Sequence, residues 1–281
     1  MREWRLTEGK ILLFRQRLRE EERSAGTIEK YIRDIRAFAA WVNGRLIWET
    51  SAAEWKRWLL EKGYRPGTVN SMLTAVNKLF SVLGRPECRT RTLKIQRRLF
   101  REPARELTRR DYGQLREAAQ SMGRERLCLL METICATGIR VSEVRHITVE
   151  AARSSRTEIM LKGKIRTILL PGKLCRKLLK YAKKQKIASG EIFLTRNGTG
   201  LSRKQIWAEM KALCAKAGVS PTKVFPHNLR HLFARIFYRS SRDVAKLADL
   251  LGHSSIETTR IYLISTGTEH MREIERLGLI S

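Results

Sequence analysis

The stretch Glu158-Ile-Met-Leu-Lys-Gly-Lys-Ile-Arg-Thr-Ile-Leu-Leu-Pro171 decides the fold class of this 281-residue chain. Its apolar runs at 158–161 and 165–170 flank a tight Lys162-Gly163-Lys164 turn. Apolar runs on both sides of a turn that contains glycine are typical of a β-hairpin. A further short strand pattern lies near 147–149, whereas most of the chain has helical spacing. We therefore predict a mainly α fold with one small β-sheet.

Helical patterns enclose this hairpin on both sides. Thr108 and Asp111 mark one helix start, and an apolar-rich helix over 127–136 ends at Gly138. Beyond the hairpin the apolar spacing predicts five more helices, over 173–186, 202–216, 227–239, 241–250 and 255–263. We assign 104–281 to a single α+β domain.

The first 84 residues have the apolar spacing of four helices. The second helix is expected to begin near Thr27, and the third with a capping box of Ser51 and Glu54. Residues 1–84 therefore form a compact helical domain. Residues 85–101 break this pattern and carry seven basic residues and one acidic residue. We interpret 85–103 as a basic linker between the two domains.

The net charge of +29 indicates a polyanionic partner. Residues 1–103 carry 23 basic and 12 acidic side chains, and residues 104–281 carry 34 and 16, so both halves are basic. We favour nucleic acid over anionic lipid because no segment stands out as a basic amphipathic helix with an apolar membrane face. The five scattered cysteines lack any CxxC pairing, so neither a disulfide framework nor a zinc site is expected.

Four short segments place polar residues among apolar ones. In the first, Arg140 follows a glycine turn and Glu143 comes three residues later, so the carboxylate can hold the guanidinium in place as a planar fork for phosphate oxygens. In the second, Lys162 and Lys164 occupy the projecting hairpin turn. Alone, the first pair would be a surface ion pair, and the turn a solvated tip.

The other two segments lie near the C-terminus. In the third, His227 and Arg230 share one helix face, where one can move a proton while the other binds the same phosphate. In the fourth, Gly252 ends a helix, His253 projects from that junction, and Tyr262 follows nine residues later. Alone, His227 and Tyr262 would be expected in the core.

Together these segments resemble the tyrosine recombinase (phage integrase) family, in particular its two-domain Xer-type members. The residues that carry the resemblance are ATGIRVSE at 136–143, the KGK turn, HNLRH at 227–231, LGH at 251–253 and the terminal tyrosine, in the family's order. The spacings also agree: 22 residues separate Arg140 from Lys162, and 23 separate Arg230 from His253. The resemblance implies a SAM-like four-helix core-binding domain before the catalytic domain.

The resemblance also implies a role for each residue. Two arginines would bind the scissile phosphate, a glutamate would support the first of them, a lysine would protonate the leaving 5′ oxygen, one histidine would transfer a proton, another would donate a hydrogen bond to phosphate, and a tyrosine would be the nucleophile. In that order, these residues are Arg140, Arg230, Glu143, Lys162, His227, His253 and Tyr262. Lys164 remains an alternative to Lys162, because hairpin length varies in this family. The phosphotyrosyl chemistry implied needs no metal, cofactor or ATP.

The implied activity is site-specific recombination of double-stranded DNA through a 3′-phosphotyrosyl intermediate. The expected assembly is a homotetramer on two duplexes, with a monomer possible without DNA, and residues 269–277 are expected to form a tail helix that packs on a neighbouring protomer. A type IB topoisomerase-like nicking-closing enzyme and a non-catalytic DNA-binding regulator remain alternatives. No membrane association is expected, and the charged start of the chain favours a cytoplasmic protein that associates with the nucleoid when it binds DNA.

Overall fold

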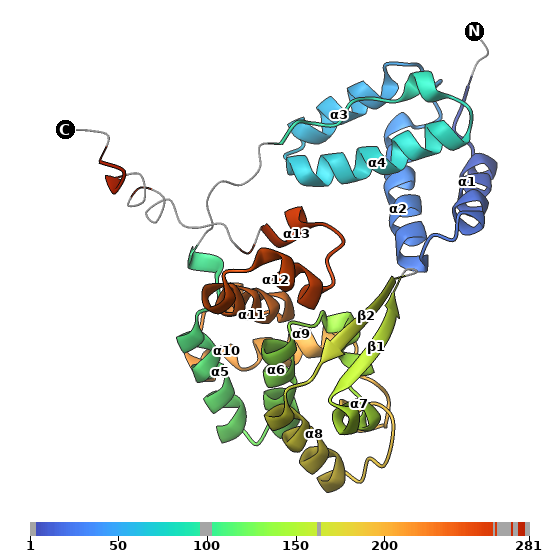
Figure 1. The fold of residues 1–281 in the computed structure, drawn as a ribbon. Helices are drawn as coiled ribbons and strands as arrows, with labels where there is room; N and C mark the ends of the chain where they lie inside the picture. The colour runs from blue at the N-terminus through green and yellow to red at the C-terminus, as the bar shows by residue number, and fades with distance from the viewer. Residues whose placement is uncertain are drawn as a thin grey trace. The chain divides into compact units, whose positions relative to one another are not determined.

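The computed structural model describes residues 4–95, 103–161, 164–260, 262, 271 and 275–278. The chain forms two compact units, Met1–Arg97 and Arg98–Ser281 (Figure 1). Lys162 and most of the predicted tail helix over 269–277 lie outside the described residues. Among the residues that are described, no helix is long and apolar enough to cross a membrane.

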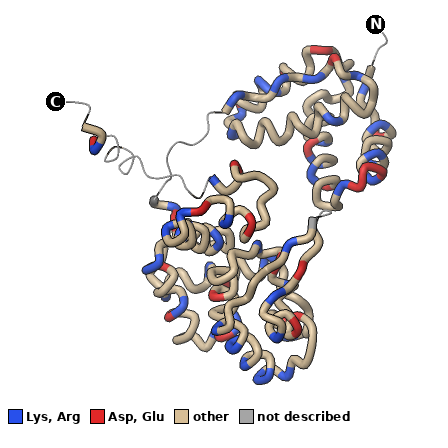
Figure 2. The backbone as a smooth tube through the Cα atoms, in the orientation of Figure 1, with Lys and Arg blue, Asp and Glu red and all other residues tan. Residues whose placement is uncertain are grey.

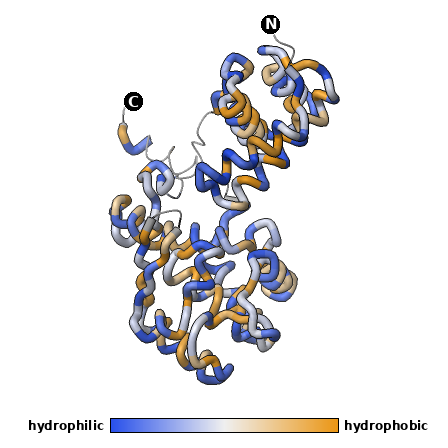
Figure 3. Tube along the Cα trace, turned by 90° about the vertical axis from the view of Figure 1, so that its right-hand side faces the viewer, coloured by the Kyte–Doolittle hydropathy of each residue, from blue (hydrophilic) through white to orange (hydrophobic). Residues whose placement is uncertain are grey.

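The first unit is a four-helix domain. Its helices are α1 (Glu8–Glu20), α2 (Ala25–Val42), α3 (Ser51–Glu61) and α4 (Pro66–Val82), followed by a 3₁₀ turn, η1 (Pro86–Cys88). The aromatic rings of Phe38 and Trp55 meet edge to face with centroids 5.0 Å apart, and Phe80 packs against Phe38 at 5.9 Å. In Figure 3 hydrophilic and hydrophobic positions alternate along these helices, as expected for helices with one buried side.

Two details of the predicted helix starts are wrong. Helix α2 begins at Ala25, two residues before Thr27, with Ser24 in the N-cap position. Ser51 does not cap α3; its hydroxyl instead accepts a hydrogen bond from the Trp48 N–H, and Thr50 occupies the N-cap position. Short hydroxyl side chains can bind several nearby backbone groups, so their positions in the sequence locate a helix start only to within a few residues.

The chain after α4 continues along the first unit. The Asn77 amide donates to the Thr90 carbonyl and accepts from the Thr90 N–H, and Asn70 makes the same paired contact with Leu93. Part of the segment assigned to the linker is therefore fastened to α4. The domain boundaries at 84 and 104 stay predictions.

The second unit is built mostly from helices around a large apolar core, beside a smaller cluster of Ala234, Leu247, Leu251 and Tyr262. A capping box of Thr108 and Asp111 begins the first of them, as the sequence predicts. The helices before the hairpin are α5 (Arg109–Ser121), α6 (Glu125–Thr137) and α7 (Val149–Ser154), with 3₁₀ turns η2 (Pro103–Arg105) and η3 (Val141–His146). Those after it are α8 (Gly172–Lys184), α9 (Arg203–Lys211), α10 (Cys214–Ala217), η4 (Pro221–Lys223), α11 (Pro226–Ser241), α12 (Val244–Leu251) and α13 (Ile256–Arg260).

The hairpin is the only sheet in the described part of the chain. Strands β1 (Arg156–Leu161) and β2 (Lys164–Leu169) pair antiparallel, with Leu161 opposite Lys164 and Ile159 opposite Arg166. The mainly α fold with one small sheet is therefore confirmed. The strand expected near 147–149 is wrong: Thr148 makes a single bridge to Glu191 and then caps α7 through its side chain.

Helix α8 corrects one expectation about amphipathic segments. Its exposed side is strongly basic, and Lys and Arg run along it in Figure 2. Its apolar residues, among them Leu174 and Leu178, are buried in the core of the second unit. The chain does contain a basic amphipathic helix, but the protein itself covers the apolar face, which leaves none for lipid.

Candidate active site

The site begins where α6 ends. Gly138 terminates this helix in the left-handed conformation, with φ of +66°, and a Cβ there would lie 2.6 Å from Cε1 of Phe233. Only glycine meets both conditions, because L residues resist positive φ and the ring leaves no space. The turn points the Gly138 carbonyl at Arg230, whose Nη1 donates to it at 2.6 Å.

Arg140 and Glu143 form the fork expected from their spacing. The Arg140 N–H donates to Oε2 of Glu143 at 2.8 Å, and Arg140 Nη1 donates to Oε1 at 2.9 Å. Glu143 is fully buried, whereas the Arg140 side chain keeps 39% of its surface exposed. Burial acts to raise the pKa of Glu143, but the hydrogen bonds from Arg140 and the nearby arginine charges outweigh it and hold the pKa below its usual value. Glu143 is therefore a stable anion beneath an accessible guanidinium.

Arg230 is almost completely buried in α11. Besides its bond to Gly138, Nη2 donates to the Leu251 carbonyl at 2.8 Å and lies 2.9 Å from Nε2 of His253. Burial lowers the pKa of Arg230 to about 10, while its interaction with Tyr262 acts in the opposite direction. The guanidinium therefore keeps its charge at neutral pH and is held in one orientation.

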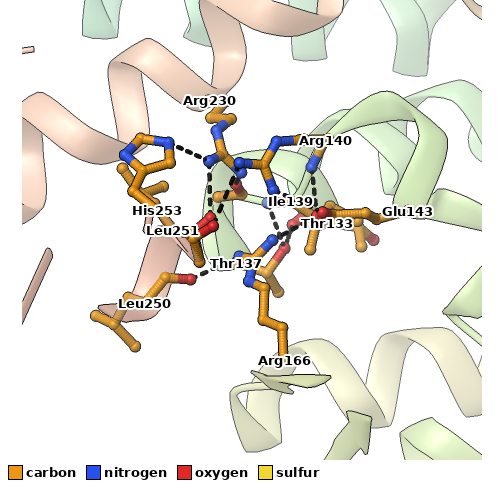
Figure 4. Close-up of polar contacts among 12 residues, drawn as sticks. Thr133, Thr137, Ile139, Arg140, Glu143, Arg166, Arg230, Leu250, Leu251 and His253 are labelled. Atoms are coloured by element: carbon orange, nitrogen blue, oxygen red, sulfur yellow. Dashed lines mark hydrogen bonds and ion pairs between the residues drawn. The ribbon is translucent and has the colours of Figure 1, made fainter. Parts of the chain in front are cut away.

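Three guanidinium groups meet the C-terminal end of α12 (Figure 4). Arg166 donates to the Leu250 carbonyl at 2.6 Å, Arg230 to that of Leu251, and Arg140 approaches that of Gly252 at 3.5 Å. Carbonyls at a helix C-terminus lack partners within the helix and carry partial negative charge. The three guanidinium groups thus hold the end of α12 in place, and the carbonyls there hold the guanidinium groups close together.

His253 follows this helix end directly. Because a guanidinium only donates hydrogen bonds, Nε2 of His253 accepts from Arg230. Nδ1 then carries the proton and faces the Thr259 hydroxyl at 2.8 Å. Burial, followed by the charges of Arg230, Arg140 and Arg166, lowers the pKa of His253 to about 4. The imidazole is neutral at physiological pH.

Tyr262 lies against two histidines and is only 5% exposed. Its ring stacks on His253 with centroids 5.8 Å apart and meets His231 edge to face at 4.5 Å. His231 in turn contacts the ring of His227 at 4.4 Å. Surrounding protein atoms and the charges of Arg230 and Arg140 lower the pKa of His227. His227 is exposed, so it stands at the solvent side of this row of rings.

The structure brings together most of the residues predicted from the motifs. Arg140 bonds to Glu143 and Arg230 to His253, and Arg140 also approaches the carbonyl of Gly252, the residue before His253. Tyr262 joins them through its ring contact with His253. His227 reaches the group through His231. Lys162 lies outside the described residues, and Lys164 is described only as the first residue of β2.

Sequence reasoning missed three residues of the site: Arg166, His231 and Thr259. Arg166 sits opposite the buried Ile159 in the hairpin register, so a cation among residues that face the core was the available signal. His231 belongs to the HNLRH motif, but no role was predicted for it. Nothing in the sequence pairs Thr259 with His253, because that contact depends on how the turn before α13 closes.

The arrangement can bind a tetrahedral oxyanion and place a hydroxyl beside it. It combines guanidinium groups held in fixed orientations, a neutral imidazole and a tyrosine within one cluster. The buried carboxylate of Glu143 pairs with two of the guanidinium groups, those of Arg140 and Arg166. Such preorganised donors are suited to stabilise negative charge that grows on a phosphate during phosphoryl transfer.

The sequence also matches known protein families. Residues 105–268 match the phage integrase family, and residues 11–86 match the phage integrase N-terminal SAM-like domain. The tyrosine recombinase XerA of Pyrococcus furiosus is 31% identical over 233 residues, which cover 79% of this chain and 78% of that protein. The tyrosine recombinase XerD of Vibrio cholerae is 27% identical over 267 residues, which cover 88% of each chain.

Solved structures share the fold at lower identity. A lambda integrase dimer bound to a COC′ core site has a TM-score of 0.73 at 17% identity, with 92% of this chain and 95% of that chain covered. The XerH recombinase bound to its difH substrate has a TM-score of 0.67 at 20% identity, with 96% and 84% covered. The family match spans more than half of the sequence, so this chain belongs to the phage integrase family and is a tyrosine recombinase.

Proposed function

We propose that this recombinase binds double-stranded DNA sites and cleaves one strand through attack of the Tyr262 hydroxyl, leaving a 3′-phosphotyrosyl link. The observation that carries the proposal is the position of Tyr262, whose ring contacts His231 and also contacts His253, the histidine bonded to Arg230. A phosphate bound by the groups around Tyr262 would be held close to this tyrosine, and its phosphorus atom is the electrophile that the hydroxyl attacks.

Arg140 and Arg230 would hold the scissile phosphate. Arg140 offers the exposed part of its guanidinium, while Glu143 fixes its direction. Arg230 supplies a charge that is buried, so little solvent is present to screen it. As the tyrosine attacks, charge builds on the nonbridging oxygens, and losing one aimed donor costs about 3–4 kcal/mol in such sites.

Proton movements fall to the histidines and a lysine. His227, exposed beside His231, would accept the tyrosine proton directly or through water. His253 would donate a hydrogen bond to a phosphate oxygen from Nε2. For this the neutral ring must carry its proton on Nε2 rather than on Nδ1, its position in this structure. The Thr259 hydroxyl can accept from Nδ1 or donate to it, so it permits both tautomers. Lys162, with Lys164 as the alternative, would protonate the leaving 5′ oxygen.

We place this activity in a homotetramer on two duplexes. A neighbour of the same fold, lambda integrase, has been solved as a tetramer bound to a Holliday junction, with a TM-score of 0.74 and 92% of this chain covered. The net charge of +29 supports DNA as the partner and predicts affinity that falls steeply with salt.

The nucleophile is tested by trapping it. DNA retained by the Tyr262→Phe protein is sequenced to identify the site, and a nicked duplex carrying that site is incubated with each protein. Wild type and Tyr238→Phe, a matched tyrosine variant in α11, should form a covalent adduct on a denaturing gel, and Tyr262→Phe should form none. An adduct that survives in Tyr262→Phe, or no adduct with any retained DNA, refutes the proposal.

The same adduct reports the polarity of the link. A 3′-phosphotyrosyl bond frees a 5′-hydroxyl end, which polynucleotide kinase labels without prior phosphatase treatment. Exchange between two duplexes of different length then separates recombination from nicking and closing, because a topoisomerase-like enzyme relaxes supercoils without producing recombinant strands.

The lysine assignment needs its own comparison. A general acid contributes about 10²–10⁴ to the rate. Lys162→Ala should therefore slow cleavage by that factor, and a substrate with sulfur in place of the leaving 5′ oxygen should restore it, since a thiolate leaves without a proton. If Lys164→Ala rather than Lys162→Ala is rescued, the assignment passes to Lys164.

A further inference from the structure

We propose that Arg166 is a positioning residue that ties the lysine-bearing hairpin to the Arg140–Glu143 fork and to the turn that carries His253. The inference rests on the proposed function and assigns a role to a residue that the motifs leave out. Arg166 makes no contact that requires DNA, so its effect on the reaction is exerted through its neighbours.

The first support is the pair of bonds that Arg166 makes from β2. Its Nη1 donates to Oε2 of Glu143 at 2.6 Å, and its Nη2 donates to the Leu250 carbonyl at 2.6 Å. The side chain is only 9% exposed. A planar guanidinium with two short bonds to different elements allows little rotation, so these three segments are held in one geometry.

The second support is that Glu143 is shared. Its Oε1 accepts from Arg140, and its Oε2 accepts from both the Arg140 N–H and Arg166. Because the carboxylate has no exposed surface, water cannot replace either arginine without opening the core. The orientation of the exposed Arg140 therefore depends on a cation that comes from the hairpin.

The third support is the close approach of Arg166 to Gly252. A Cβ at Gly252 would lie 2.7 Å from Nε of Arg166 and would also run into its Cδ. The guanidinium stem thus lies directly against the backbone of this glycine, whose φ is +62°. The next residue is His253, so the Arg166 side chain forms the surface on which the histidine turn rests.

The hairpin completes the connection. Arg166 follows Lys162 by four residues and Lys164 by two. Lys164 begins β2, and at roughly 3.3 Å per residue along a strand it lies about 7 Å from the anchored arginine. Fixing Arg166 therefore fixes the strand that begins with Lys164 and follows Lys162 in the sequence. Hence one side chain sets the mutual placement of the acid, the phosphate clamp and the imidazole.

The kinetic test uses the nicked duplex and the full-length protein. Arg166→Ala, Arg166→Lys and Arg156→Ala are compared, the last being an exposed arginine of the same hairpin. Misplacement of reacting groups by about 1 Å costs about 10²-fold in rate. At saturating DNA we therefore expect adduct formation to slow about 100-fold in Arg166→Ala, with the DNA dissociation constant changed less than threefold. Arg156→Ala should keep the wild-type rate.

Arg166→Lys keeps the buried charge but can reach only one of the two acceptors, so its rate should fall between wild type and Arg166→Ala. This variant also serves if Arg166→Ala does not fold. A rate within threefold of wild type in both variants overturns the proposal. A loss confined to DNA affinity, or an equal loss in Arg156→Ala, overturns it as well.

A second readout needs neither DNA nor catalysis. The Arg166 charge contributes to the lowered pKa of His253, after burial and the charges of Arg230 and Arg140, but is not among the causes acting on His146. In Arg166→Gln, imidazole NMR should show the pKa of His253 rising towards its usual value and that of His146 unchanged. An unmoved His253 pKa contradicts the close contact between Arg166 and this turn and overturns the proposal even if recombination is established, whereas a raised pKa supports that contact even if the phosphotyrosyl mechanism fails.

Discussion

Glu143→Gln tests whether the buried carboxylate holds the site together. The substitution keeps the shape of the side chain and removes its charge. In the native protein Oε2 accepts from the Arg140 N–H and from Arg166, and Oε1 accepts from Arg140 Nη1. A glutamine keeps one acceptor oxygen and turns its NH₂ group towards a guanidinium that can only donate. At least one charged hydrogen bond is lost, and two cations lose their anion.

The size of the effect follows from burial. Glu143 has no exposed surface, and the Arg166 side chain is 9% exposed, so the unpaired charge stays away from water. Removing one partner of a buried ion pair costs about 3–5 kcal/mol. For a unit of this size, each kcal/mol lowers the melting temperature by about 2–4 °C. We expect the second unit of Glu143→Gln to melt about 10 °C below wild type.

The assay must separate the two units, because five of the six tryptophans precede residue 59 and fluorescence reports mainly on the first unit. Hydrogen exchange followed by mass spectrometry in urea gives separate unfolding curves for peptides of α6 and of α2. The control is Glu125→Gln, which breaks an exposed pair with Lys184 and should leave both curves unchanged. If Glu143→Gln destabilises α6 peptides by less than 1 kcal/mol, or no more than Glu125→Gln, the buried carboxylate does not hold the cluster.

Three further predictions concern the second unit. Burial lowers the pKa of His231 to about 3, so the unfolded chain takes up a proton at this residue before the folded protein does as the pH falls. This residue should therefore lower the free energy of unfolding by about 2 kcal/mol between pH 7 and pH 5. Urea titrations of His231→Gln should lack that part of the loss. Leu178→Ala on the buried face of α8 should cost about 2–5 kcal/mol, whereas Lys180→Ala on its exposed face should leave the midpoint unchanged; equal effects would mean that the apolar face is not in the core. Gly138→Ala and Gly190→Ala both place alanine at positive φ, but only the first meets a side chain, so thermal denaturation should show a cost greater by about 1–3 kcal/mol for Gly138→Ala.

The local elements of the fold were predictable because their signals are local. The hairpin over 158–170 was identified from its apolar runs and turn, and the helix start at Thr108 from its acid three residues later. The strand expected near 147–149 was wrong because Thr148 instead caps a helix through its side chain, and its single bridge is to Glu191, a residue 43 positions along the chain.

The sequence by itself indicated most of the residues that the structure brings together, because residue types in a fixed order can be read without knowing how the chain packs. It paired Arg140 with Glu143 correctly because three residues of separation keep that contact local. Only the tertiary structure decided that Arg166 shares the same carboxylate from 23 residues away, and that the successive carbonyls of Leu250, Leu251 and Gly252 at the end of α12 each meet a different arginine. Such contacts depend on where a helix end, a strand and a turn come to rest against one another, which is set by burial across the whole unit rather than by the spacing of neighbours along the chain.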